Sequence, residues 1–159
     1  MPLRIGSSLP ELSGATEWFS GTQAHAEAEA KGHPTLVHFW SLSCGTCKDN
    51  LPRVAQWRDE LKDAGLRVIA VHMPRYESDT NTESVREAIA NHDITEVCGV
   101  DNEHKLKDAF KNDQGYVPAY YLFDSEGKLR SFAAGERGLD MLKSALDRVL
   151  TKADQQAQS

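Results

Sequence analysis

Two cysteines three positions apart stand between a predicted strand and a predicted helix, and this placement constrains the chain more than any other feature. The apolar run Thr35–Trp40 precedes Cys44 and Cys47, and a helical pattern follows them. Amides in the first turn of a helix lack internal partners, and the helix dipole adds partial positive charge there. Because the thiolate is the nucleophile, a cysteine at this position is favoured as an attacking group. The junction therefore indicates thiol–disulfide exchange.

The composition is that of a globular protein and excludes several classes of function. A chain of 159 residues is long enough for one domain with its own core, so we expect residues 1–159 to form a single domain. The net charge is −6 and the chain has no block of lysine and arginine, which argues against a nucleic-acid or anionic-membrane partner. No stretch approaches the roughly 20 apolar residues that span a bilayer.

The cysteine content and the first eight residues indicate the cellular compartment in which the protein works. Three cysteines are too few for a secreted scaffold held by disulfides. Residues 1–8 lack the apolar segment of a signal peptide. We therefore expect a cytoplasmic protein. A piece of a membrane-anchored or exported protein, taken without its anchor, would have the same composition, so that alternative stays open.

Strand and helix patterns alternate along the chain and close with a hairpin and a helix. The predicted helices are Gln23–Lys31, Gly45–Ala64, Thr82–His92, His104–Phe110 and Arg137–Leu150, and the predicted strands are Thr35–Trp40, Leu66–Met73, Glu96–Val100, Pro118–Phe123 and Lys128–Ala134. Residues 1–16 are predicted to be a leading arm and residues 152–159 a frayed tail. The alternation predicts an α/β fold with a central mixed sheet covered by helices on both faces. Open α/β sheets place their sites at the carboxyl ends of the strands, where the cysteine pair falls.

The cysteine pair and its companions resemble the thioredoxin superfamily. Phe39–Trp40 precede the motif, Pro52 follows eight residues beyond the first cysteine, and Val117–Pro118 precede the final hairpin. A strand–helix insertion before that hairpin, which contains Thr82–His92, is similar to the TlpA/ResA-like branch. The similarity covers nearly the whole chain. It implies a thioredoxin fold and thiol–disulfide oxidoreductase activity.

The resemblance also implies roles for the matching residues. Cys44 would attack a substrate disulfide, and Cys47 would resolve the mixed disulfide. The Val117–Pro118 peptide bond is expected to be cis and to offer a backbone edge near Cys44 with which an extended substrate segment pairs.

Further residues are expected to shape the substrate groove. Gly45 and Thr46 lie between the two cysteines, and Gly135 matches a family glycine that flanks the same groove. Trp40 would cover the disulfide, although a purely core role for Trp40 stays open.

Two positions depart from thioredoxin itself. His38 stands six residues before the first cysteine, where thioredoxin has a buried aspartate that helps to move the proton of the buried thiol. An imidazole could do the same with a pKa nearer neutrality, and a hydrogen-bonded core histidine is the alternative. Thr46 replaces the proline that thioredoxin carries between its cysteines, so the reduction potential of thioredoxin does not transfer.

Simpler interpretations compete for several residues. Cys44 and Cys47 could form half of a structural zinc site, but the sequence has no second pair to complete four ligands, so we expect no metal. Cys98 is interpreted as a small buried residue, with a third redox role as the alternative. The other five histidines are interpreted as ordinary surface or strand-end residues, and the loop Tyr76–Asn81 as solvated surface that could border the groove.

Other functions remain as alternatives to disulfide exchange. A peroxidase would need a cysteine in a loop rich in proline and threonine, which the segment before Cys44 lacks. Copper delivery lacks a further cysteine or methionine ligand near the pair. A non-catalytic binding module would keep the fold and ignore disulfides.

The sequence as a whole predicts a monomeric thioredoxin-like disulfide reductase of the cytoplasm. Its partners would be protein disulfides or dithiols and an upstream electron donor. We expect no cofactor, because the electrons reside on Cys44 and Cys47.

Overall fold

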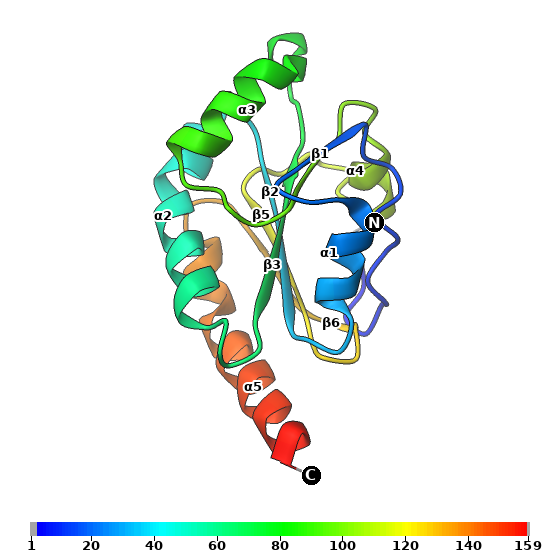
Figure 1. The fold of residues 1–159 in the computed structure, drawn as a ribbon, viewed down its shortest axis with the longest axis vertical. Coiled ribbons are helices and arrows are strands. Elements are labelled where there is room, and N and C mark those ends of the chain that lie inside the picture. Colours follow the sequence, from blue (N-terminus) through cyan, green and yellow to red (C-terminus); the bar gives the residue numbers. More distant parts are fainter. Residues whose placement is uncertain (1–2, 159) are drawn as a thin grey trace.

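Six strands in the described residues, 3–158, form one mixed sheet in the computed structural model (Figure 1). The strands are β1 Glu17–Phe19, β2 Thr35–Trp40, β3 Arg67–His72, β4 Cys98–Val100, β5 Ala119–Phe123 and β6 Leu129–Ala134. Their order across the sheet is β1-β4-β3-β2-β5-β6. β2, β3 and β4 run parallel, whereas β1, β5 and β6 each pair antiparallel with a neighbour. Because β2 is central and covered on both faces, all six of its residues are buried.

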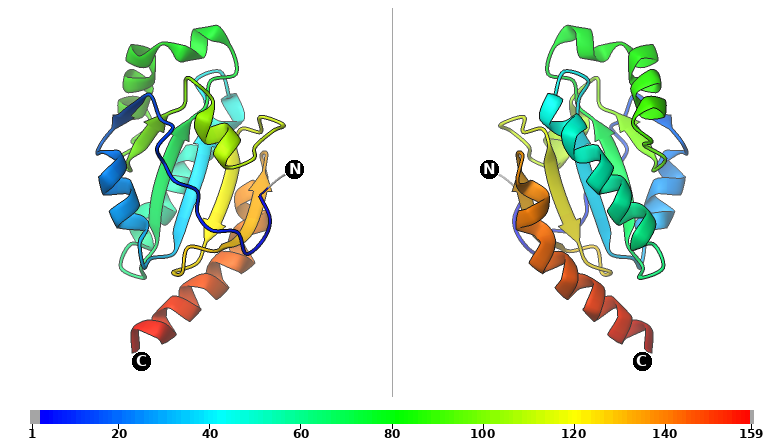
Figure 2. Two further views of the ribbon diagram at one scale, coloured as in Figure 1. Left: turned by 90° about the vertical axis from the view of Figure 1, so that its right-hand side faces the viewer. Right: turned by 90° about the vertical axis from the view of Figure 1, so that its left-hand side faces the viewer.

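Helices cover both faces of this sheet. They are α1 Gln23–Ala30, α2 Gly45–Glu60, α3 Thr82–Asn91, α4 Lys105–Ala109 and α5 Gly138–Gln158, with a short 3₁₀ helix, η1, at Glu77–Thr80. α2, α3 and α5 lie on one side of the sheet and α1 and α4 on the other (Figures 1 and 2). This arrangement confirms the predicted α/β thioredoxin fold, including the strand–helix insertion before the final hairpin.

The alternation of side chains along β2 divides the core between the two faces. Val37 and Phe39 pack with α1 and α4 in one apolar cluster. Leu36 packs with α2 and α5 on the opposite face. Trp40, on the same face as Leu36, joins a third cluster that contains both cysteines of the motif and α3. The two cysteines therefore pack against the buried core beside Trp40, at the carboxyl end of β2.

Most predicted elements have observed counterparts, with ends that differ by a few residues. α2 ends at Glu60, before the predicted Ala64, because the chain turns back there and Leu66 donates its backbone N–H to the Leu61 carbonyl. α3 is capped by Asn81, whose side chain accepts the Ser84 amide, and the expected cap Thr82 is the first helical residue.

The two ends of the chain show the larger differences from the prediction. A frayed tail was expected over residues 152–159, whereas α5 continues through Gln158, because alanine and glutamine favour helix and no glycine or proline ends it; Ser159 lies outside the described residues. β1 directly follows the leading arm and was not predicted. Only its pairing with β4 defines this three-residue strand. Among the described helices, none is long and apolar enough to cross a membrane.

Candidate active site

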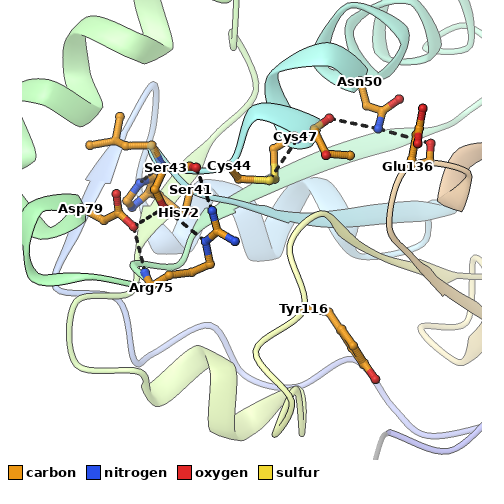
Figure 3. The surroundings of a disulfide bond; sticks show 12 residues. Ser41, Ser43, Cys44, Cys47, Asn50, His72, Arg75, Asp79, Tyr116 and Glu136 are labelled. Carbon is orange, nitrogen blue, oxygen red and sulfur yellow. Dashed lines mark hydrogen bonds between the residues drawn. A yellow bond between two sulfur atoms is a disulfide. The ribbon is translucent and has the colours of Figure 1, made fainter.

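Cys44 and Cys47 form a disulfide at the point where the chain leaves β2 and begins α2 (Figure 3). Cys44 is the N-cap residue of α2, and its Sγ accepts a hydrogen bond from the Cys47 amide at 3.0 Å. Both side chains are nearly buried, with 3% and 1% exposed. Since a helix N-terminus favours negative charge, this position stabilises a thiolate on Cys44 once the disulfide is reduced.

The short loop before Cys44 is held by the end of β3. Met73 donates its backbone N–H to the Trp40 carbonyl at 2.8 Å, which extends the parallel pairing of the two strands. Leu42 donates its amide to Nε2 of His72 at 3.1 Å, so the imidazole must be neutral on that nitrogen. Burial lowers the pKa of His72 to about 4, although the nearby Asp79 carboxylate opposes this shift.

Asp79 forms a hydrogen bond with Ser43, the next residue of the same loop. Its carboxylate accepts the Ser43 hydroxyl at 2.7 Å and the backbone amides of Arg75 and Tyr76 at 3.0 and 3.3 Å. Burial tends to raise the pKa of Asp79, but these three hydrogen bonds outweigh it and the pKa is lowered. Only 2% of Asp79 is exposed, so the interpretation of this loop as solvated surface is wrong for this residue.

His72 and Trp40 form the buried side of the site. Their rings pack edge to face, with centroids 4.8 Å apart, and both residues are fully buried. Trp40 therefore packs against the cysteines from inside the core and does not line an open groove. His72 does stand at a strand end, as expected, but it is not an ordinary strand-end residue. No local pattern distinguishes it from the other histidines.

The predicted cis bond at Val117–Pro118 is confirmed. Pro118 is buried and Val117 is half-buried, packed against the cluster that contains the cysteines. Gly135 donates its amide to the Pro118 carbonyl at 3.0 Å and has a φ of +88°, a conformation that favours glycine. The structure thus joins Gly135 to the proline, and its place in a substrate groove stays a prediction.

Gly45 and Thr46 form the first turn of α2 between the cysteines. The Thr46 carbonyl accepts the Asn50 side-chain amide at 3.1 Å, and the same amide reaches the Glu136 carbonyl at 3.4 Å. Asn50 therefore connects the motif helix to the segment after β6 (Figure 3). Sequence reasoning missed Asn50 because an asparagine in an exposed helix turn carries no distinguishing signal.

His38 lies in a buried polar chain on the face of β2 that also carries Trp40. Its Nε2 is 2.6 Å from Oε2 of Glu96, and Oε1 of Glu96 accepts Nη1 of Arg58, also at 2.6 Å. Burial alone would raise the pKa of Glu96, but the hydrogen bonds and charges of His38 and Arg58 outweigh it and the pKa is lowered. Glu96 is thus a carboxylate, and His38 donates to it.

Cys98 is fully buried in the cluster that contains the motif cysteines. Burial raises the pKa of its thiol to about 12, with a smaller opposing effect from the Trp40 indole. A thiol of this kind is almost entirely protonated near neutral pH. The interpretation of Cys98 as a small buried residue agrees with this environment.

Comparison with known proteins gives the family. Residues 5–132 match the AhpC/TSA family. YkuV, a thiol-disulfide oxidoreductase of Bacillus subtilis (strain 168), is 43% identical over 152 residues, which cover 96% of this chain and 100% of YkuV. The chain belongs to the AhpC/TSA family of thioredoxin-like proteins. This membership confirms the resemblance on which the roles of Cys44 and Cys47 were predicted.

Two further similarities extend over most of the chain. Protein DipZ of Mycobacterium bovis is 31% identical over 148 residues, which cover 92% of this chain but only 21% of DipZ. The solution structure of a thioredoxin-like protein in the oxidized form is 45% identical, with a TM-score of 0.83, and covers 94% of this chain and 99% of that protein. The similarity to these proteins thus covers both the fold and the Cys44–Cys47 motif.

The neutral, buried His72 makes the stability of the protein pH-dependent. Its pKa is about 4 in the folded chain and about 6.5 in an unfolded one, so between pH 7 and pH 5 only the unfolded state takes up this proton. Stability is therefore lost as the pH falls through this range, by about 2 kcal/mol from this group. We expect His72→Gln, which keeps an acceptor for Leu42, to lose about 2 kcal/mol less than wild type between pH 7 and pH 5.

Urea unfolding followed by tryptophan fluorescence at both pH values measures the two losses. His25→Gln removes one exposed imidazole and serves as the control. Equal losses in wild type and His72→Gln would contradict the assignment of a neutral, buried His72.

Proposed function

We propose that the protein reduces disulfide bonds of other proteins through Cys44 and Cys47. The observation that carries this proposal is the position of Cys44: it caps α2, and its Sγ already accepts the Cys47 amide at 3.0 Å. A sulfur at this position gains from the helix dipole as a thiolate and has its resolving partner within bonding distance. Similarity to the thiol-disulfide oxidoreductase YkuV over the whole length of YkuV supports exchange between dithiol and disulfide at this pair.

The reaction transfers two electrons from the cysteine pair to the substrate. The Cys44 thiolate attacks one sulfur of the substrate disulfide; the substrate S–S bond breaks, a mixed disulfide forms, and the other substrate sulfur leaves as a thiolate. The Cys47 thiolate then attacks Sγ of Cys44, which closes the Cys44–Cys47 disulfide and releases the second substrate sulfur. The substrate leaves as a dithiol after taking up protons, and a donor dithiol must reduce the enzyme again.

The substrate would bind as an extended segment beside Val117–Pro118. A peptide in this conformation offers backbone groups to an unpaired edge, and recognition through the backbone tolerates many sequences. Gly135 supports the proline from the other side through its hydrogen bond to the Pro118 carbonyl. Gly45 and Thr46, between the cysteines, form the opposite border of the same groove.

His38 is proposed as the group that moves the proton of Cys47. It lies on the face of β2 that carries Trp40 in the cluster with the cysteines, and its bond to the Glu96 carboxylate fixes the orientation of the ring. The Arg58 guanidinium bonds the second oxygen of the same carboxylate, so Glu96 keeps its position beside His38. His38 would thus accept the thiol proton before Cys47 attacks.

The protein is proposed to act as a monomer in the cytoplasm. A reductase needs a compartment that keeps its donor reduced, and the cytoplasm is such a compartment. The small number of cysteines, with no disulfide framework beyond the motif pair, fits this setting.

Turbidity of insulin in the presence of dithiothreitol tests the reductase activity directly. We expect the wild-type protein to accelerate insulin disulfide reduction and Cys44→Ser to lose all acceleration, because the attacking sulfur is gone. The matched control is Cys98→Ser, which also removes one thiol but leaves the motif intact and should retain activity. A wild-type rate equal to the dithiothreitol background would refute the proposed function.

The resolving role of Cys47 predicts a trapped intermediate. In Cys47→Ser the mixed disulfide through Cys44 cannot be resolved, so it should accumulate with disulfide-bearing substrates. Non-reducing electrophoresis with mass spectrometry of the adduct measures this, with reduced and alkylated insulin as the substrate control. If the adduct forms through Cys98, or if none forms with intact insulin, the assignment of Cys47 is wrong.

The proton-transfer role of His38 predicts an altered pH profile. We expect His38→Gln to slow resolution of the mixed disulfide several-fold near pH 7 and to lose part of the pH dependence, since the amide can hold the hydrogen bond to Glu96 but accepts no proton. Stopped-flow measurement of the resolving step between pH 5.5 and 9 checks this. A profile that superimposes on that of wild type would leave His38 a structural residue.

A further inference from the structure

Arg75 reaches from the loop after β3 to the backbone immediately before Cys44 (Figure 3). Its Nη2 donates to the Ser43 carbonyl at 2.8 Å, and its Nε donates to the Ser43 hydroxyl at 3.2 Å. The Ser43 carbonyl belongs to the peptide group whose nitrogen is that of Cys44. The guanidinium is therefore one peptide unit from the attacking cysteine.

Several contacts hold the Arg75 guanidinium in one position. Asp79 accepts both the Arg75 amide and the Ser43 hydroxyl, so one buried carboxylate orients the two residues toward each other. The Tyr76 ring lies beside the guanidinium, with 5.6 Å from Cζ to the ring centroid. Arg75 is exposed, and a long side chain at an exposed position ordinarily has many conformations, so these contacts select one.

The charge of Arg75 is not neutralised by an ion pair within the described part of the chain. Its side chain donates to two neutral oxygens of Ser43, whereas Arg53, Arg58, Arg67, Arg86 and Arg130 all pair with carboxylates. The Asp79 carboxylate is the nearest acid bonded to this loop, and it accepts the Arg75 amide rather than the guanidinium. The guanidinium thus has no carboxylate of the described residues bonded to it, and the Ser43 hydroxyl stands between it and the Asp79 carboxylate.

We propose that Arg75 is a positioning residue that favours the thiolate form of Cys44 through this charge. The inference deepens the proposed function and rests on it. An opposite charge near a titratable sulfur favours its ionised form, and this effect adds to that of the α2 N-terminus and of the Cys47 amide. A more stable thiolate favours the reduced protein, so Arg75 also makes the Cys44–Cys47 pair more oxidising.

Other ionisable groups surround Cys44 and set the background for this effect. Asp79 and the neutral His72 face the loop from β3 and the segment after it. The half-buried Lys48 and the exposed Asp49 follow in the first turns of α2, and the resolving thiol of Cys47 lies on the same helix. These groups are unchanged in a variant at position 75, so a difference between variants reports on Arg75 alone.

The pH dependence of Cys44 alkylation tests the proposal without any disulfide substrate. Iodoacetamide is added to Cys47→Ser protein, where Cys44 is the reactive thiol, and the adduct is followed by mass spectrometry from pH 4 to pH 10. We expect Arg75→Gln to raise the midpoint of the alkylation curve by roughly 0.5 to 1 pH unit, because the cation is lost. Arg75→Lys keeps the charge and should restore at least half of that shift.

Two controls separate a local charge effect from other causes. Arg86→Gln removes the same charge from an exposed position on α3 and should leave the midpoint within 0.2 pH unit of the parent protein. In about 1 M salt, where the Debye length is about 3 Å, the shift caused by Arg75→Gln should shrink.

The proposal is overturned by any of three results: an unchanged midpoint in Arg75→Gln, an equal shift in Arg86→Gln, or a shift in Arg75→Lys as large as that in Arg75→Gln. Since alkylation requires no disulfide reduction, a protein without insulin reductase activity would still give this answer. Failure of the proposed function and failure of the Arg75 inference are thus distinguishable.

Discussion

The attachment of the loop before Cys44 to the end of β3 is the interaction on which the rest of the site depends. Parallel pairing of β2 with β3 continues past the strands through the bond from Met73 to Trp40. This brings the last side chain of β3, His72, and the later Asp79 to Leu42 and Ser43, where they accept the backbone amide and the hydroxyl of the loop. With the loop held, the start of α2 and the sulfur that caps it have one position. Preorganisation of this kind lets a reactive group act without first becoming ordered.

Two polar networks lie near the site and differ in how their charges are paired. The first, around Asp79, lies at the carboxyl ends of the strands and keeps an unpaired cation near the solvent. The second joins His38, Glu96 and Arg58 inside the fold, where every charge has a partner. A buried charge left alone is costly, so the bonds of Glu96 to both His38 and Arg58 are what allow this carboxylate to be buried. In the mechanism that we propose, the outer network instead acts on the Cys44 sulfur through space.

The sequence allowed the fold and the reacting atoms to be predicted because both depend on local patterns. The buried strand before Cys44, the helical stripe after Cys47 and the proline before the last hairpin are each visible within a few residues. The supporting residues were missed because their environments come from distant segments. His72 and Asp79 resemble surface residues in sequence, and only the parallel alignment of β2 with β3 buries them.

The chemistry of the pair was indicated by the sequence itself, because two thiols at three-residue spacing, at a strand-to-helix junction, are suited to exchange with a disulfide. What surrounds that pair was decided by the tertiary structure alone. Arg75 lies 31 positions after Cys44 in the chain and yet donates to the peptide group directly before it. Local propensity carries no information about such a contact, because it arises when two strands align and the loops after them meet at one edge of the sheet.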